Sequence, residues 1–227
     1  WSSDVCSSDL EAVRARRVEE MKMIQGEEEE SRQVVDRLNR DKKKYQKQLS
    51  DKKKEVEAMN REIDRIIRET MNGGKASSGS KGKPKQAIDY KLAGQFESNK
   101  GKLPWPADGP VVDHFGQHYH PVYTNVKLPF NNGVTIALAP GTDVNCVFDG
   151  VVKQIVVMPG YSKCVLVQHG SYFTFYCKLG SVNVKAGDKV KTNQKIGTVD
   201  TIGGETQLHF QIWSGRNPQD PESWLRP

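Results

Sequence analysis

The first third of the chain has apolar residues whose spacing alternates between three and four positions wherever an otherwise imperfect pattern is filled. Between residues 10 and 72 these positions form a heptad seam among charged residues, without any proline: Met21, Ile24, Val35, Leu38, Tyr45, Leu49, Val56, Met59, Ile63 and Ile66. This spacing is typical of a helix that packs against another helix in a coiled coil. A helix this polar is not stable alone, so its seam needs a partner. The pattern leaves open whether it is a spacer or an arm that docks another protein.

Residues 73–103 are predicted to be a linker that contains one short helix. The first part is rich in Gly, Ser and Lys, a composition typical of flexible linkers. Within residues 87–99, Ile88, Leu92 and Phe96 lie four positions apart, which predicts a short amphipathic helix. We expect this helix to lie against the following domain, either as part of its core or as a regulatory lid over a groove.

Residues 104–227 show a different pattern, with short and often alternating apolar runs that end at Gly, Pro, Asn or Asp. This pattern predicts an antiparallel β domain, so the whole chain is predicted to be α+β. The predicted strands are residues 134–137, 144–148, 151–158, 164–169, 172–179, 182–184, 195–199 and 208–213. In the last of them, Gln207, His209 and Gln211 alternate with apolar residues and are expected to share one wet face of the sheet.

The strand pattern also predicts a hairpin that turns at Gly170-Ser171. Its register places Cys164 opposite Cys177. The pair is either two small apolar residues or a disulfide formed in an oxidising compartment. None of the four cysteines has CxxC spacing, which argues against a cysteine zinc site.

The charge distribution argues against nucleic-acid binding. The chain has 34 basic and 28 acidic residues, a net charge of +6, and residues 73–102 hold 7 basic and 2 acidic residues. The excess positive charge therefore lies in the linker and not on a folded surface. No apolar run approaches the ~18 residues of a membrane span, and no signal peptide is visible. Residues 1–9 match neither neighbour in composition, so we interpret them as non-native and expect any export signal to be missing.

Several motifs in the β domain occur in the order found in one protein family. They are FGQHYHP at 115–121, DGVV at 149–152, KAGDKV at 185–190, QKIG at 194–197, LHF at 208–210 and DP at 220–221. In this order they resemble the LytM or lysostaphin-type zinc endopeptidases, which cleave peptidoglycan cross-bridges. The resemblance covers residues 103–227 and implies that family's duplicated-hybrid-motif fold.

The resemblance also implies where a zinc site would lie. The family holds zinc with the His and Asp of an HxGxD motif and the second His of HLH, and those positions here carry Asn131, Thr135 and His209. Its two further catalytic histidines correspond to Lys178 and Gln207. Asn and Thr are poor zinc ligands, and a lysine would repel a dication. We therefore expect a degenerate site with no metal, no cofactor and no catalytic residue.

A second set of histidines is the main alternative for a metal site. His114, His118 and His120 would share one face of a strand. They lie in or beside the motif at 115–121, where the family's residues have loop and groove roles. We therefore expect them not to bind a metal.

A degenerate LytM domain after a coiled coil resembles the EnvC-type murein hydrolase activators. The resemblance implies an exported, periplasmic protein whose groove activates an N-acetylmuramoyl-L-alanine amidase in cell separation. It implies that the coiled coil contacts a membrane division complex of the FtsE–FtsX type, and that an intervening helix occludes the groove. The expected groove residues are Asn131, Thr135, Lys178, Gln207 and His209, with walls from Phe115 and Tyr176. Two alternatives are an active zinc endopeptidase and a passive peptidoglycan-binding module.

Overall fold

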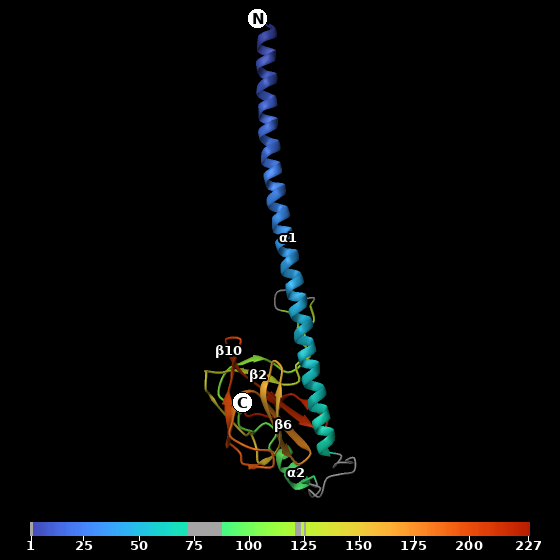
Figure 1. Cartoon of the computed structure of the whole chain (residues 1–227), viewed down its shortest axis with the longest axis vertical. Coiled ribbons are helices and arrows are strands. Elements are labelled where there is room, and N and C mark those ends of the chain that lie inside the picture. The colour runs from blue at the N-terminus through green and yellow to red at the C-terminus, as the bar shows by residue number, and fades with distance from the viewer. Residues whose placement is uncertain (1, 72–87, 121–123, 125) are drawn as a thin grey trace. The chain divides into compact units, whose positions relative to one another are not determined.

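The computed structural model describes residues 2–71, 88–120, 124 and 126–227, with side chains from residue 11 onward (Figure 1). The chain divides into two compact units, Trp1–Asp51 and Lys52–Pro227. The first part of the predicted linker, residues 73–87, lies outside the described residues. None of the helices in the described part of the chain has the length and apolar content that a membrane span requires.

Helix α1 (Ser2–Met71) confirms the long helix that the heptad pattern predicts. In the first unit most of its seam side chains are exposed, for example Val35 at 54% and Leu38 at 58%, and Leu49 is half-buried. The described residues of this unit include no second helix, so the coiled coil stays a prediction.

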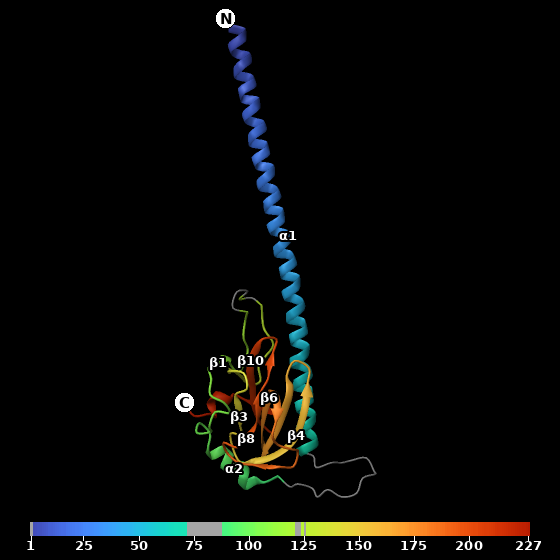
Figure 2. The same ribbon diagram turned by 60° about the vertical axis from the view of Figure 1, so that its left-hand side comes forward.

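The second unit is built on an antiparallel sheet, as the alternating pattern predicts (Figure 2). Its main strand order is β1-β2-β10-β6-β5-β4-β7, while β3 pairs with β8, β8 with β6, and β9 and β11 with β10. The strands are β1 (Val111–Asp113), β2 (Val134–Ala137), β3 (Asp143–Asn145), β4 (Gly150–Met158), β5 (Ser162–His169), β6 (Tyr172–Val182), β7 (Lys189–Val190), β8 (Lys195–Val199), β9 (Thr201–Ile202), β10 (Glu205–Ser214) and β11 (Asn217–Gln219).

Most predicted strands are confirmed, and one is wrong. The predicted strand at 182–184 does not exist, because Val182 is the last residue of β6 and residues 183–184 belong to no strand. The predicted hairpin is confirmed: β5 and β6 turn at Gly170-Ser171, and His169 pairs with Tyr172. Gly170 has φ +72°, a conformation that glycine adopts without strain.

Alternation along the strands gives the sheet two apolar faces. On one, which we call the core face, Leu208, Phe210 and Ile212 of β10 join the larger hydrophobic cluster. On the other, the site face, Trp213 of β10 joins Phe173, Phe175 and Cys177 of β6 and Cys164 and Leu166 of β5. Strand residues two apart point to the same side, which explains this division.

Helix α2 (Tyr90–Ser98) belongs to the core face and confirms the predicted short helix. Its N-cap is Asp89, whose side chain accepts a hydrogen bond from the Leu92 amide at 3.0 Å. Phe96 is fully buried, and its ring centroid lies 4.9 Å from that of His169 and 5.2 Å from that of Trp224. Of the two roles considered for this helix, the structure shows core packing. A short 3-10 helix (Pro221–Ser223) follows β11.

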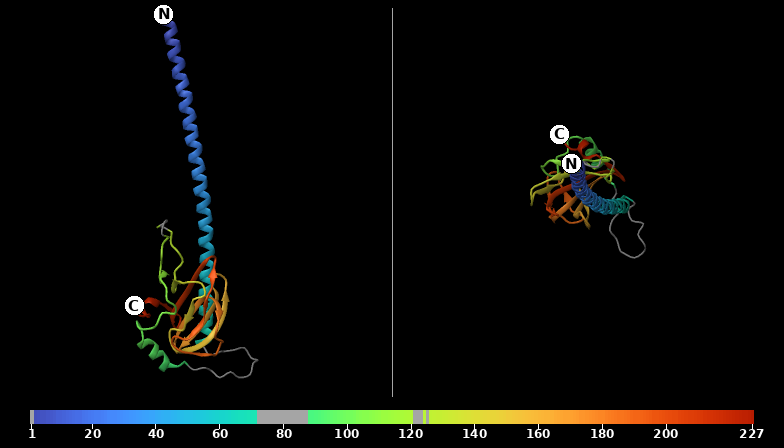
Figure 3. Two further views of the ribbon diagram at one scale, coloured as in Figure 1. Left: turned by 90° about the vertical axis from the view of Figure 1, so that its left-hand side faces the viewer. Right: turned by 90° about the horizontal axis from the view of Figure 1, so that it is seen from above.

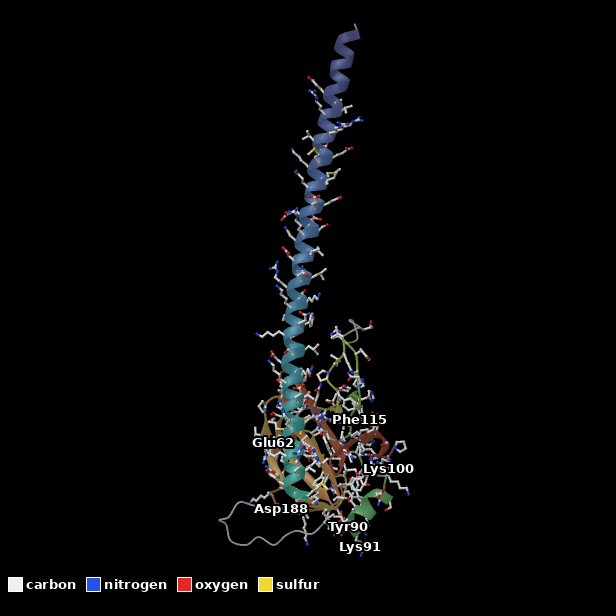
Figure 4. All side chains as sticks on the ribbon, turned by 90° about the vertical axis from the view of Figure 1, so that its right-hand side faces the viewer. Glu62, Tyr90, Lys91, Lys100, Phe115 and Asp188 are labelled. Atoms are coloured by element: carbon white, nitrogen blue, oxygen red, sulfur yellow. The ribbon has the colours of Figure 1, made fainter. Side chains whose placement is uncertain are left out.

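The opposite face of the sheet is covered by residues 52–71 of α1, which we call the cover segment (Figure 3). Its residues Met59, Ile63, Ile66 and Ile67 are at most 3% exposed and join the site-face cluster. The lower part of the heptad seam therefore packs on a β-sheet and not on a second helix. Figure 4 labels Glu62 on this segment, and Tyr90 and Lys91 at the start of α2 in another part of the unit.

Candidate functional site

Strand β10 carries the polar residues around which the candidate site is built. His209 pairs with Thr135 of β2 on one side and with Cys177 of β6 on the other. The expectation of a wet face is wrong, because His209 is 4% exposed and Gln211 is fully buried. The Sδ atom of Met59, on the cover segment, lies 3.8 Å from Gln211 Nε2. The cover segment has therefore removed this part of the strand from water.

A chain of hydrogen bonds fixes the protonation of His209. The Trp213 ring nitrogen can only donate, and it donates to Gln211 Oε1 at 2.8 Å. This bond orients the Gln211 amide, so that its Nε2 donates to His209 Nε2 at 2.8 Å. His209 therefore carries its proton on Nδ1, which donates to Thr135 Oγ1 at 3.2 Å. Both ring nitrogens are engaged within the protein.

The surroundings of His209 also keep its ring neutral. Burial lowers its pKa to about 3, and the positive charges of Lys178 and Lys52 add to the effect. At neutral pH the imidazole is uncharged, because no carboxylate lies among these causes to stabilise a charged ring.

Lys178 and Gln207 contact each other at the edge of the site. Lys178 Nζ donates to Gln207 Oε1 at 2.8 Å. Burial lowers the pKa of Lys178, with a smaller contribution from the charge of Lys52. The backbone of Lys178 has φ +68° at an irregular position of β6, and its amide donates to Tyr161 O at 2.7 Å. The two positions at which the resemblance implies catalytic histidines are thus expected, not shown, to be degenerate, and the structure pairs their lysine and glutamine.

The other expected site residues lie in two different surroundings. Asn131 uses its side chain to hold the local backbone, since Nδ2 donates to His114 O at 2.9 Å and Oδ1 accepts from the Gly133 amide at 3.1 Å. Phe115 is half-buried, and its ring packs edge-on against Phe130 with centroids 5.4 Å apart.

Tyr176 does not line the site, and its assignment as a groove wall is wrong. It is fully buried on the core face, where its ring centroid lies 5.2 Å from that of Phe210. Its hydroxyl accepts a hydrogen bond from the Val147 amide at 3.0 Å. Tyr176 precedes Cys177 by one residue, so strand alternation directs its side chain away from His209.

The cluster of histidines before β2 has hydrogen-bond partners of its own. His114 Nδ1 lies 2.8 Å from a carboxylate oxygen of Glu222, and this bond raises the His114 pKa. His118 Nε2 lies 2.7 Å from the His114 carbonyl oxygen and donates to it. Across the described residues, no group of three or more His, Cys, Asp or Glu is arranged to hold a metal ion.

The donor chemistry of the site does not fit a catalytic zinc ion. Such an ion takes about three protein ligands from His, Cys, Asp and Glu and keeps one position for water. The corresponding positions here offer an amide bonded to backbone, a hydroxyl, and an imidazole with both nitrogens engaged. The ammonium of Lys178 is close enough to influence His209, and it would oppose a bound dication.

Comparison with known proteins identifies the domain that carries this site. Residues 129–221 match the model of Peptidase family M23. The chain contains an M23 domain. The M23 domain and its flanks are 35% identical over 119 residues to cell division protein DipM of Caulobacter vibrioides, covering 51% of this chain and 18% of DipM. They are 36% identical over 96 residues to peptidoglycan DD-endopeptidase ShyA of Vibrio cholerae, covering 41% of this chain and 22% of ShyA.

The matches to these relatives are partial. The chain spans about a fifth of the length of each of these two curated proteins. Among solved structures, Helicobacter pylori Csd3 aligns with a TM-score of 0.48 and 28% identity, covering 55% of this chain and 35% of Csd3.

The M23 domain also makes site contacts that the sequence alone did not indicate. Gln211 and Trp213 set the tautomer of His209, and Asn132 Nδ2 donates to Asn60 Oδ1 of the cover segment at 2.8 Å. The alternation of β10 placed Gln211 on the face of His209, but it did not indicate the bonds of Gln211 to His209 and Trp213. No sequence pattern indicated the contact between Asn60 and Asn132, because the two residues are 72 positions apart in the sequence.

Proposed function

We propose that this chain is a non-catalytic activator of peptidoglycan amidases, and that its M23 domain binds the amidase through the site face. The observation that carries the proposal is the state of His209, whose two ring nitrogens bond Thr135 and Gln211. A site in this state has no ligand set for zinc and no metal-bound water to act as nucleophile. The domain keeps the scaffold of a peptidoglycan enzyme and can act only by binding.

In this proposal the cover segment masks the binding face of the free activator. Four apolar side chains of α1 pack on the sheet, and polar contacts flank them. Asp64 accepts two hydrogen bonds from Arg216, at 2.6 and 3.1 Å, and Asn60 accepts one from Asn132. An amidase that uses this face must displace the segment, so the free protein would be mostly closed. The short helix α2 takes no part, since it packs on the core face.

The proposal includes an exported protein that acts in the periplasm during cell separation. The names of the two relatives support this setting, because DipM is a cell division protein and ShyA is a peptidoglycan endopeptidase. We propose that the exposed seam of α1 contacts a membrane division complex of the FtsE–FtsX type. Peptidoglycan itself is a further proposed contact of the M23 domain, and nucleic acid is not.

An amidase assay on dye-labelled sacculi tests this function. The full chain alone should release no dye, and adding it to a purified cell-wall amidase should raise the rate of release. Stoichiometric zinc in the purified chain, with cleavage by the chain alone that His209→Ala abolishes, would establish an endopeptidase instead. Tight binding to sacculi without stimulation of any amidase would favour a passive binding module.

A further inference from the structure

Two cysteines lie side by side on neighbouring strands of the site face. Cys164 of β5 lies between Lys163 and Val165, where the register with β6 shifts, and Cys177 of β6 lies between their partners Leu179 and Tyr176. Both cysteines are fully buried, neither is in a disulfide, and their thiols share a hydrogen bond.

The placement of this pair suits a covalent bond between the two sulfurs. Opposed residues in antiparallel strands have Cα atoms about 4.5–5.5 Å apart, within the range of about 4.4–6.8 Å that a disulfide spans. A bulge re-aims the side chain that it carries, which relieves the awkward approach of two directly opposed residues. Cys146 is separated from the pair, because it belongs to the core-face cluster and its thiol contacts Phe148 O at 3.1 Å.

We propose that Cys164 and Cys177 form a thiol–disulfide site that closes across β5 and β6. The thiolate of one cysteine attacks the disulfide of a donor, either a small-molecule disulfide or a disulfide-donor protein, and releases one donor thiol. The thiolate of the second cysteine then attacks the mixed disulfide and releases the other donor thiol. The two cysteines lose two electrons and two protons, which the two donor thiols gain, so the exchange balances.

The cover segment controls access to this site. Both sulfurs belong to the same buried cluster as Met59 and Ile63 of α1. Burial raises the pKa of the Cys177 thiol, and the neighbouring Cys164 thiol adds to the effect. Because the thiolate is the reactive form, exchange in the closed protein is slow. The disulfide forms either before the cover segment packs or while it is displaced, so in the folded protein it forms only when the site face opens.

Oxidation of the full chain by oxidised glutathione, followed by non-reducing digestion and mass spectrometry, tests the pairing. After refolding with the reagent, the main cross-link should join the peptides of Cys164 and Cys177, with a loss of about two mass units. Cys177→Ala should remove this cross-link, and Cys164 should not form a new cross-link to Cys146 instead. Free thiols at both positions after refolding, or a dominant cross-link to Cys146 or Cys6, would overturn the proposal. The wild-type peptide map decides the pairing even if the variant fails to fold.

The same measurement on the folded protein tests the control of access. Oxidation should be slow in the wild-type chain and several-fold faster in Ile63→Ala, which loosens the cover segment. The matched control is Val35→Ala, which truncates an exposed residue in the other unit of the same helix. Equal rates in the wild type and Ile63→Ala, with circular dichroism showing both folded, would refute control by the cover segment.

Discussion

Single residues on the two faces of the sheet show how this fold buries polar groups. His169 lies on the core face, where Nδ1 donates to Asp149 O at 2.7 Å and Nε2 accepts from Thr174 Oγ1 at 2.9 Å. His209 is held in a similar way on the site face. Burial lowers the pKa of His169 to about 4 and that of His209 to about 3. Both histidines are therefore neutral in the fold and would gain a proton on unfolding below pH ~6.5.

This difference predicts that the protein loses stability in mild acid. The unfolded chain binds more protons than the folded chain between the folded pKa values and ~6.5, so stability falls as the pH is lowered through that window. At pH 5 each histidine should cost about 2 kcal/mol relative to pH 7.5. Urea unfolding at several pH values measures this, and His169→Gln should flatten the dependence by about half. His114 is the control, because it is exposed and its pKa is raised, so His114→Gln should not flatten the curve.

The two glutamines of β10 provide a second test at the residue scale. Gln211→Leu should cost about 2–4 kcal/mol of unfolding free energy, because it leaves the Trp213 and His209 ring nitrogens unpaired in a buried site. Gln207→Leu is the matched control and should cost less than about 1 kcal/mol, since Gln207 is only half-buried. Chemical denaturation of both variants compares them. Equal losses would show that the hydrogen-bond chain is not a structural unit.

The family resemblance implied that His209, Thr135, Lys178 and Gln207 belong to one site, and the structure brings them near one another. Strand alternation assigned the face of His209 correctly but not its burial, because the residues that exclude water come from α1. The error with Tyr176 has a different cause. A groove role was inferred from resemblance, whereas its position next to Cys177 in β6 already directed it to the other face.

At the scale of elements, α2 is part of the core rather than a lid. Phe96→Ala should lower the unfolding free energy by about 3–5 kcal/mol, since its ring is fully buried against His169 and Trp224. Tyr90→Ala on the same helix is the control, because Tyr90 is 77% exposed, and it should change stability by at most about 0.5 kcal/mol. Thermal unfolding measures both. If Phe96→Ala left stability unchanged and made the chain stimulate the amidase more strongly, α2 would be a lid over the groove and not part of the core.

The cover segment predicts a different outcome for its own variants. Ile63→Ala removes a fully buried side chain from the interface with the sheet, which should favour release by about 2–5 kcal/mol. Since each ~1.4 kcal/mol is a tenfold change in an equilibrium, amidase stimulation should rise on the order of tenfold or more. The dye-release assay measures this, with Val35→Ala as the control that leaves the interface intact. Stimulation that stays at the wild-type level in a folded Ile63→Ala chain would contradict masking.

Periodicity predicted most of these elements because each is a local pattern. The strands follow a period of two, and α1 and α2 follow a helical period. The surface against which an apolar stripe packs is not determined by the neighbouring sequence. Met59, Ile63 and Ile66 were expected to meet another helix, and they meet β4, β5, β6 and β10, which begin more than 80 residues later.

For the whole molecule, the two units predict separate effects of truncation. Removing residues 1–51 should leave the melting temperature of the remainder within a few degrees of the full chain, because residues 52–227 form a compact unit of their own. Removing residues 1–71 should lower it much further, because Met59, Ile63, Ile66 and Ile67 leave with the cover segment and expose the apolar site face. Differential scanning calorimetry of the two truncations compares them. Equal melting temperatures would show that α1 contributes nothing to the M23 fold.

Gly133 shows why such a domain can remain recognisable when residues of its site differ from the family pattern. A Cβ atom built at this position would lie 2.2 Å from the carbonyl oxygen of Phe210. Any side chain there would force apart β2 and β10, whereas Asn131 and Thr135, two residues away on either side, only have to fit their own surroundings. The framework and the reaction are therefore subject to separate constraints. A sequence signature written around such tight backbone contacts detects shared ancestry, and enzymatic competence has to be judged at the neighbouring positions.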